Sequence, residues 1–231
     1  NLDDAIINVN TDAVHDFDGV NDYIEIADDN SLDFGTDDFT ISVWFKTSGT
    51  GLAQHQTILS KQNPEDSTEW VLQIHKDTHY VTFRTNATDI LTGTSTVNDG
   101  GWHNAIVKRT SGVFTLYIDN TLQDTTTSSQ TLTNGEVLRI GRRLSAYNGY
   151  FVGSIADVRI YDAALDATGL SVLASKINVD TSLGAGTTNL QMHIPIAGTT
   201  IDLNDSENSN DGTASGSPAT VYDAFSVNVQ D

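Results

Sequence analysis

Short apolar runs with a period of two restrict the fold of this chain more than any other feature. In residues 39–46, Phe, Ile, Val and Phe alternate with Thr, Ser, Trp and Lys, as in a strand with one buried face. Similar runs occur at 70–75, 114–118 and 190–196, separated by polar turn clusters, and only 164–176 has a brief helical pattern. The chain is therefore predicted to be all-β: an antiparallel two-sheet β-sandwich or jelly roll with one short helix.

The charge balance excludes several functions. The 231 residues contain 31 acidic and 11 basic side chains, and 26 of the acidic residues are Asp. Such a negative chain, with no basic cluster larger than Arg142-Arg143, would repel nucleic acid. No apolar run reaches the ~18–20 residues of a membrane helix, so we expect no membrane insertion. The absence of Cys excludes disulfides, thiolate zinc sites and cysteine nucleophiles.

The two ends of the chain suggest a repeat. The sequence begins at Asn1 without a signal peptide, which favours a segment of a longer protein. Residues 223–231 weakly echo residues 4–12 at an offset of 219 positions. We interpret this echo as one unit of a tandem array whose neighbouring repeats would be partners. Alternatively, two acidic edge strands match by chance.

Five sequence blocks carry a family resemblance. They occupy residues 16–26, 39–46, 101–107, 114–120 and 153–165. Taken in this order and spacing, they resemble the laminin-G-like, concanavalin A-like jelly-roll family. The resemblance covers about residues 16–166, and it implies an extracellular or cell-surface domain with this fold.

The C-terminal residues depart from the family pattern. The apolar strand and the Asn/Asp/Gly-rich turn that usually open the domain occur here at 190–196 and 205–213. We favour a single domain over residues 1–231, in which 188–231 completes the sandwich in permuted order. In the alternative, 188–231 starts the next tandem repeat, and its strand would then lack a partner. A domain swap between neighbouring chains is a further variant.

Asp residues in loops suggest a calcium site, because Ca²⁺ takes six to eight oxygen ligands. Asp18 and Gly19 lie on a tight turn where a carboxylate and main-chain carbonyls can converge. The resemblance implies one structural Ca²⁺ held at Asp18 and Asp157, to which Asn208 and Asn210 would add oxygens if the permuted order holds. Alternatively, the two Asp side chains only cap turns. We expect the domain to depend on Ca²⁺ for stability.

Catalytic patterns are missing, whereas candidate ligand contacts are present. The chain has neither the Glu-x-Asp-x-Glu strand of related glycanases nor a Gly-x-Ser-x-Gly elbow, so we expect no enzyme. Tyr147, Asn148 and Tyr150 lie in a loop that strand pairing does not need, and Trp70 is a second candidate for contact with a sugar. The alternative for Trp70 is core packing, because it alternates with apolar residues.

These observations and the resemblance together suggest a function. We expect an extracellular, calcium-binding, lectin-like module that recognises glycans or cell-surface polysaccharide within a larger adhesin or secreted protein. One alternative is a structural spacer repeat that binds Ca²⁺ but no glycan. Another is a protein-binding domain, which would expose an apolar patch of several hundred Å².

Overall fold

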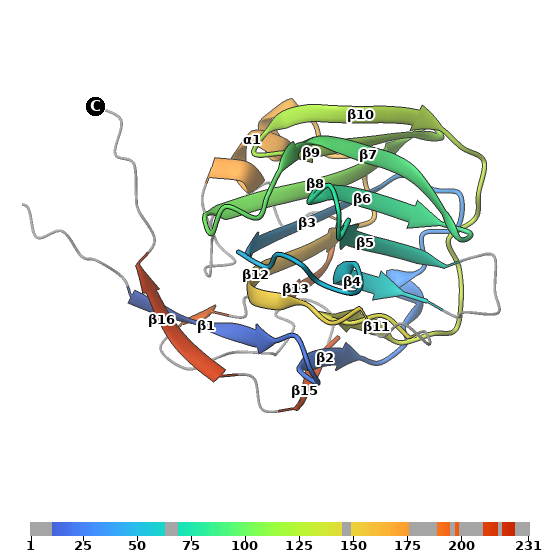
Figure 1. Ribbon diagram of the computed structural model, residues 1–231. Coiled ribbons are helices and arrows are strands. Elements are labelled where there is room, and N and C mark those ends of the chain that lie inside the picture. Colours follow the sequence, from blue (N-terminus) through green and yellow to red (C-terminus); the bar gives the residue numbers. More distant parts are fainter. Residues whose placement is uncertain are drawn as a thin grey trace, which may run out of the picture.

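The computed structural model describes residues 11–62, 69–144, 149–175, 189–194, 197–198, 210–216 and 219–224. In this part of the chain two antiparallel sheets face each other (Figure 1). The predicted β-sandwich is confirmed, and so is the single short α-helix. The nine-stranded sheet has the order β10 (Thr121–Thr127), β9 (Val113–Ile118), β8 (Trp102–Thr110), β3 (Phe39–Lys46), β12 (Val152–Tyr161), β1 (Thr11–Asp18) and β14 (Ala197–Gly198), with β13 (Leu190–Ile194) beside β12 and β16 (Ala219–Ala224) beside β1.

The second sheet has seven strands and provides the face on which the candidate site lies. Its spatial order is β15 (Gly212–Ser215), β2 (Tyr23–Ile26), β11 (Leu138–Ile140), β4 (Gln56–Lys61), β5 (Trp70–Ile74), β6 (Tyr80–Thr85) and β7 (Thr88–Thr96). A single 3₁₀ turn, η1 (Asn30–Leu32), follows β2.

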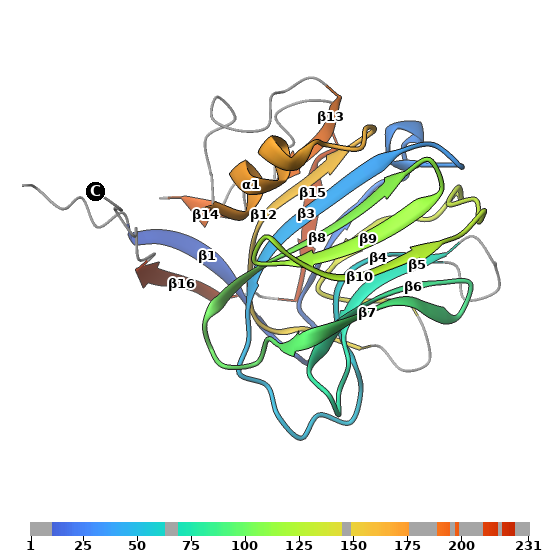
Figure 2. The ribbon, with the colours of Figure 1, turned by 90° about the horizontal axis from the view of Figure 1, so that it is seen from above.

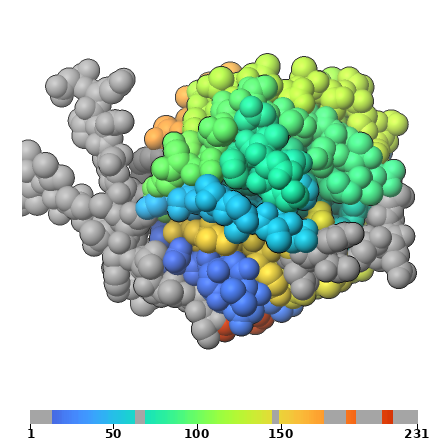
Figure 3. All heavy atoms as spheres, viewed as in Figure 1, coloured from blue at the N-terminus to red at the C-terminus, as the bar shows by residue number. Residues whose placement is uncertain are grey.

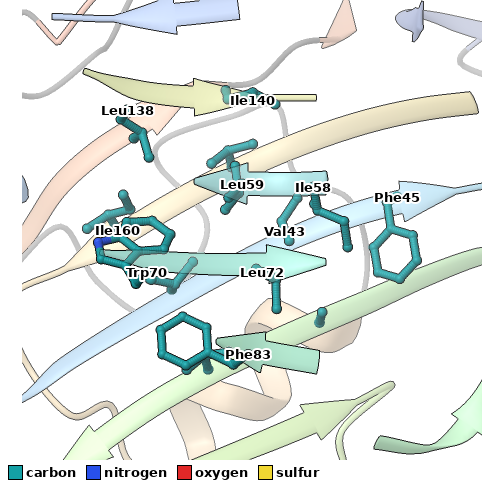
Figure 4. Close-up of a cluster of buried hydrophobic side chains, with 14 of the residues drawn as sticks. Val43, Phe45, Ile58, Leu59, Trp70, Leu72, Phe83, Leu138, Ile140 and Ile160 are labelled. Atoms are coloured by element: carbon teal, nitrogen blue, oxygen red, sulfur yellow. The ribbon is translucent and has the colours of Figure 1, made fainter. Parts of the chain in front are cut away.

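The alternating apolar side chains fill the space between the sheets. In β3, Phe39, Ile41, Val43 and Phe45 are fully buried, as the period of two predicts. They meet side chains from β4, β5, β6 and β11, including Trp70 (Figure 4). Burying aliphatic and aromatic side chains of this size contributes about 1.5–3 kcal/mol each. This interior is therefore the main source of stability for both faces of the sandwich.

Helix α1 (Ala167–Ser175) covers the outer face of the nine-stranded sheet (Figure 2). Its Leu170 and Leu173 are buried against Ile106 and Tyr161, and the indole Nε1 of Trp44 donates a hydrogen bond to the carbonyl of Leu173 at 3.0 Å. The helix thus protects one sheet from solvent. No helix in the described ranges is both long and apolar enough to span a membrane.

Two buried cations tie loops to the core. The Lys61 ammonium is fully buried and donates to Asp28 (2.7 Å), Asp33 (2.8 Å) and the carbonyl of Asn134. Arg109, which is 1% exposed, donates to main-chain carbonyls that include those of Phe34 and Gly35. A buried charge is tolerated only when it is paired in this way, so each cation fixes the loop that surrounds it.

The C-terminal segment contributes strands to both sheets of the same chain. Strand β13 pairs with β12, β15 with β2, and β16 with β1. Met192 and Ile194 of β13 are fully buried in the main hydrophobic cluster. The single-domain organisation in permuted order stays a prediction, and these pairings favour it over a tail that opens the next repeat.

Replacing Ile194 with Ala is expected to lower the free energy of unfolding by about 2–5 kcal/mol, because a buried side chain is removed from a packed core. Urea denaturation followed by Trp fluorescence measures this change. Val20→Ala, at a position 69% exposed, is the control and should have little effect. A cost for Ile194→Ala as small as that of the control would place β13 outside the core. Elution at twice the monomer mass in gel filtration would place it in a neighbouring copy.

Candidate functional site

Asp18 ends β1 and starts the turn into β2. Its Oδ1 accepts hydrogen bonds from the backbone N–H groups of Val20 (2.7 Å) and Asn21 (3.2 Å), and Gly19 has a φ of 77°. The bond from Val20 is the main reason why the pKa of the Asp18 carboxyl lies below its usual value, since hydrogen bonds to a carboxylate favour the charged form. Asp18 is therefore an exposed anion that caps a turn.

Asp157 has very different surroundings. It lies at an irregularity of β12, between the residues that pair with β3, with a φ of 49° and 2% exposure. Its Oδ1 accepts from Nε of Arg159 at 2.7 Å and lies 2.9 Å from Nε2 of His193. The carboxylate is thus committed to two basic groups on the nine-stranded sheet, one of them on β13.

The structure does not bring the predicted calcium ligands together. Asp18 pairs with Val152, whereas Asp157 lies five residues further along β12, about 16 Å away at ~3.3 Å per residue. Asn210 precedes β15, and its Nδ2 donates to Oγ of Ser31 (3.2 Å) and to the carbonyl of Gln191 (3.0 Å).

Asn210 is also remote from Asp18. The far end of β15, at Ser215, pairs with Tyr23 at the start of β2, so Asp18 and Asn210 lie at opposite ends of this strand pair. Asn208 lies outside the described residues. A single ion therefore cannot be held by Asp18, Asp157 and Asn210 together. Within the described ranges, no three His, Asp or Glu side chains are grouped so that they could hold a metal ion.

Trp70 belongs to the hydrophobic core. It is fully buried, and its ring lies 5.9 Å from that of Phe34 and 6.1 Å from that of Phe83. The core-packing alternative applies, and Trp70 cannot contact a ligand at the surface. Alternation along β5 pointed to this outcome, because Leu72 and Ile74 share the same face.

Tyr150 lies in an aromatic cluster on the outer face of the seven-stranded sheet. Its ring lies 6.4 Å from that of Tyr23, which points outward because Ile24 on the same strand is in the core. The Arg142 guanidinium lies 4.7 Å from the Tyr23 ring centre and 5.4 Å from that of Tyr150, within the range of cation–π attraction. Tyr23, Arg142 and Tyr150 are called the tyrosine platform below.

Only part of the predicted loop site is described. Tyr147 and Asn148 lie outside the described residues, and Tyr150 is half-buried. Sequence reasoning did not identify Tyr23 or Arg142 as partners of Tyr150. They come from β2 and from the loop after β11, and only the pairing of β2 with β11 places them side by side.

Main-chain hydrogen bonds hold the loop between β11 and β12 against β4. The N–H of Gly141 donates to Ile58, that of Phe151 donates back to Gly141, and that of Thr57 donates to Gly149, each at 2.9 Å. Figure 3, seen from this side, shows the residues around 55 next to those around 140–150. Loops whose ends meet in this way are compact, so the loop residues Arg142, Arg143 and Tyr150 start from a fixed base.

A row of polar side chains crosses the same face. Gln73 of β5 pairs with Thr57 of β4 and with Thr82 of β6, and all three are at most 1% exposed. These residues are called the polar row below. Nη1 of Arg143 donates to Oε1 of Gln73 at 3.4 Å.

His55 and His75 lie near the polar row, with ring centres 4.5 Å apart. Residues 75–79 form the hairpin turn that the sequence predicts, closed by a hydrogen bond from the N–H of His79 to the carbonyl of His75. Sequence reasoning missed the polar row, because outward Thr and Gln residues are ordinary on a strand. Only their complete burial distinguishes them.

Comparison with known proteins identifies the family. The model of the Laminin_G_3 family, described as the concanavalin A-like lectin/glucanases superfamily, matches residues 18–171. The chain belongs to this family. No curated protein matches the chain.

Solved structures share the fold of this laminin-G-like chain. A provisionally assigned carbohydrate-binding protein from Bacteroides ovatus aligns with a TM-score of 0.72 and 16% identity, over 94% of this chain and 62% of that protein. The chain thus spans less than two thirds of that relative. The CBM40 domain of a Ruminococcus gnavus sialidase bound to α2,3-sialyllactose aligns with a TM-score of 0.52 and 16% identity, over 68% and 95% of the two chains.

Laminin itself is also similar. Domains LG4-5 of the mouse laminin α1 chain align with a TM-score of 0.51 and 18% identity, over 67% of this chain and 44% of that chain. At such identities these likenesses show the fold alone, and the ligands must be argued from the residues of this chain.

Asp157→Asn is expected to lower the free energy of unfolding by about 3 kcal/mol, because it removes the negative charge from between Arg159 and His193 in a buried position. Asn tolerates a positive φ, so the variant tests the charge and not the backbone. Urea denaturation in EDTA and in millimolar CaCl₂ should give the same loss. The exposed Asp77→Asn serves as the control. A loss that is present in CaCl₂ and absent in EDTA would instead make Asp157 a metal ligand.

Proposed function

We propose that this laminin-G-like domain is a non-catalytic, extracellular glycan-recognition module of a larger protein, and that the outer face of its seven-stranded sheet contacts the sugar. The tyrosine platform carries this proposal. It offers two partly exposed aromatic rings and a guanidinium on one rigid face, and sugars bind to flat aromatic surfaces edged by polar groups.

The surroundings of the platform support a binding role. Glu25 of β2 accepts a hydrogen bond from Nε of Arg139 of β11 at 2.8 Å, so polar groups that can bind hydroxyls flank the two rings. Rigid aromatic side chains supply contact area at low entropic cost. Carbohydrate-binding proteins among the structural neighbours make this ligand class the first to test.

The exposed large apolar side chains give less support to a protein partner. Among the described residues they are Val20, Val113, Leu122 and Val172, and they belong to four separate segments. Protein-binding surfaces collect apolar side chains into contiguous patches. A glycan ligand therefore accounts better for the aromatic and polar character of the seven-stranded sheet.

Tyr150→Ala and Arg142→Gln are each expected to weaken glycan binding at least tenfold, about 1.4 kcal/mol, because each removes part of the platform. A glycan array selects the ligand, and isothermal titration with the strongest hit measures the affinity. Leu122→Ala, 53% exposed on the other sheet, is the control and should bind like the parent chain. Undiminished binding by Tyr150→Ala would remove the platform from the site. An array without any hit would favour a spacer domain.

Calcium binding is the second part of the proposal, and Asp18 is the residue that supports it. Its carboxylate is exposed and ionised, and the chain carries a formal charge of −20. A dication bound at the turn would reduce repulsion and fix the junction of β1 and β2. A ligand at ~100 times its Kd stabilises the folded state by about 2.7 kcal/mol.

Millimolar CaCl₂ is therefore expected to raise the melting temperature above its value in EDTA, and Asp18→Asn should abolish most of that rise. Asp29→Asn is a matched control, because Asp29 is also exposed and accepts a hydrogen bond from a turn N–H, that of Ser31, at 2.8 Å. Equal melting temperatures in CaCl₂ and EDTA for the parent chain would overturn the calcium proposal.

A further inference from the structure

The polar row presents unsatisfied groups in a buried position. Thr57 Oγ1, Gln73 Nε2 and Thr82 Oγ1 have no hydrogen-bond partner among the described residues, although all three side chains are at most 1% exposed. A buried polar group without a partner costs about 1–3 kcal/mol. Three such groups in register on β4, β5 and β6 indicate that an additional partner completes them.

Arg143 determines which end of the Gln73 amide is presented. Its Nη1 donates to Oε1 of Gln73 at 3.4 Å, so the amide oxygen is occupied and Nε2, with two N–H bonds, is left for another partner. A carbonyl or carboxylate oxygen can accept from this group. Thr57 and Thr82 on either side can also donate through their hydroxyls.

The two histidines are donors as well. Nδ1 of His55 accepts from the N–H of Lys76 at 3.1 Å, and Nδ1 of His75 accepts from the N–H groups of Asp77 (3.3 Å) and Thr78 (3.4 Å). A neutral ring whose Nδ1 accepts a hydrogen bond carries its proton on Nε2. Both rings therefore present an Nε2–H donor, and this tautomer is unsuited to metal binding through Nε2.

The local electrostatics are positive, in contrast to the whole chain. The pKa of His55 lies below its usual value, first because of burial and then because of His75 and Arg143, whose effect exceeds the opposing effect of Asp89. Nearby acids have cations beside them: Asp77 pairs with Lys76 at 2.8 Å, and Asp89 lies 3.6 Å from Arg84. An anionic ligand group would thus be attracted at this point of an acidic surface.

Resting on the proposed glycan-binding function, we propose that the polar row with His55, His75 and Arg143 binds the carboxylate of an acidic sugar. A carboxylate has two oxygens that only accept hydrogen bonds, which matches a site made of donors. The row on β5 lies three strand spacings from Tyr23 on β2, about 14 Å at ~4.8 Å per strand. One acidic oligosaccharide could therefore stack on the tyrosine platform and place its carboxylate at the row.

Isothermal titration with matched sugar pairs tests this proposal. Sialyllactose and trigalacturonate represent the two sources of a sugar carboxylate, lactose and galactotriose are their neutral counterparts, and lactose 6′-sulfate tests a different anion. We expect at least one carboxylated sugar to bind at least 30-fold more tightly than its neutral counterpart. The sulfated sugar should show no such gain.

Variants of the row should remove the preference for the acid. Gln73→Glu replaces the Nε2 donor by an anionic oxygen, and His75→Phe, at a half-buried position that tolerates change, removes a donor but keeps the ring next to His55. Each should bring acidic and neutral sugars to within about threefold of each other. His79→Phe, in the same hairpin, is the control and should keep the preference.

The possible results separate this proposal from the proposed function. If neutral sugars bind as tightly as their acidic counterparts, or if the sulfated sugar gains as much as the carboxylated ones, the carboxylate site is overturned while glycan binding stands. If none of the five sugars binds and a glycan array also gives no hit, the proposed function fails as well. A preference for the acid that survives in folded His75→Phe and Gln73→Glu would locate the carboxylate elsewhere.

Discussion

The hydrogen bonds that hold the loop after β11 against β4 are the constraint on which the candidate site depends. They are main-chain bonds at Gly141, Gly149 and Phe151, so they leave the loop side chains available for other contacts. Gly149 is required for the close approach, because a Cβ there would lie 2.9 Å from the carbonyl oxygen of His55 at a φ of 30°. Through this one attachment Arg142 and Tyr150 reach the platform, while Arg143 reaches the polar row.

Several basic residues of this acidic protein are used inside it. Lys61, Arg109 and Arg159 are at most 3% exposed, and each is surrounded by carboxylates or carbonyls that it holds in place. Removing them from the surface makes the exterior more negative than the composition alone suggests. A face where Arg142 and Arg143 remain half-exposed is therefore unusual for this molecule, and binding gives their position a physical reason.

The fold was largely predictable, whereas the site was not. Alternating apolar residues determine which strand faces are buried, so β3 and β5 follow from the sequence, and Trp70 could be assigned to the core by the same argument. The calcium ligands could not be placed, because they depend on pairing and on local irregularities. In β12 the register shifts between Ala156 and Arg159, and this shift turns Asp157 toward Arg159 and His193. In β4 a comparable shift between Thr57 and Leu59 sets Thr57 opposite Gln73.

The overall charge determines how such a site would select its ligand. At a formal charge of −20 the molecule repels anions at long range, but at physiological salt this field decays over about 8 Å. An acidic sugar is therefore attracted only where donors act at hydrogen-bond distance, since such bonds to a charged group contribute about 1.5–3 kcal/mol each. Elsewhere on the surface the same ligand meets Asp side chains that only accept hydrogen bonds. Short-range donors on a repulsive background thus give specificity without high general affinity, because every wrong position of an anionic ligand is disfavoured.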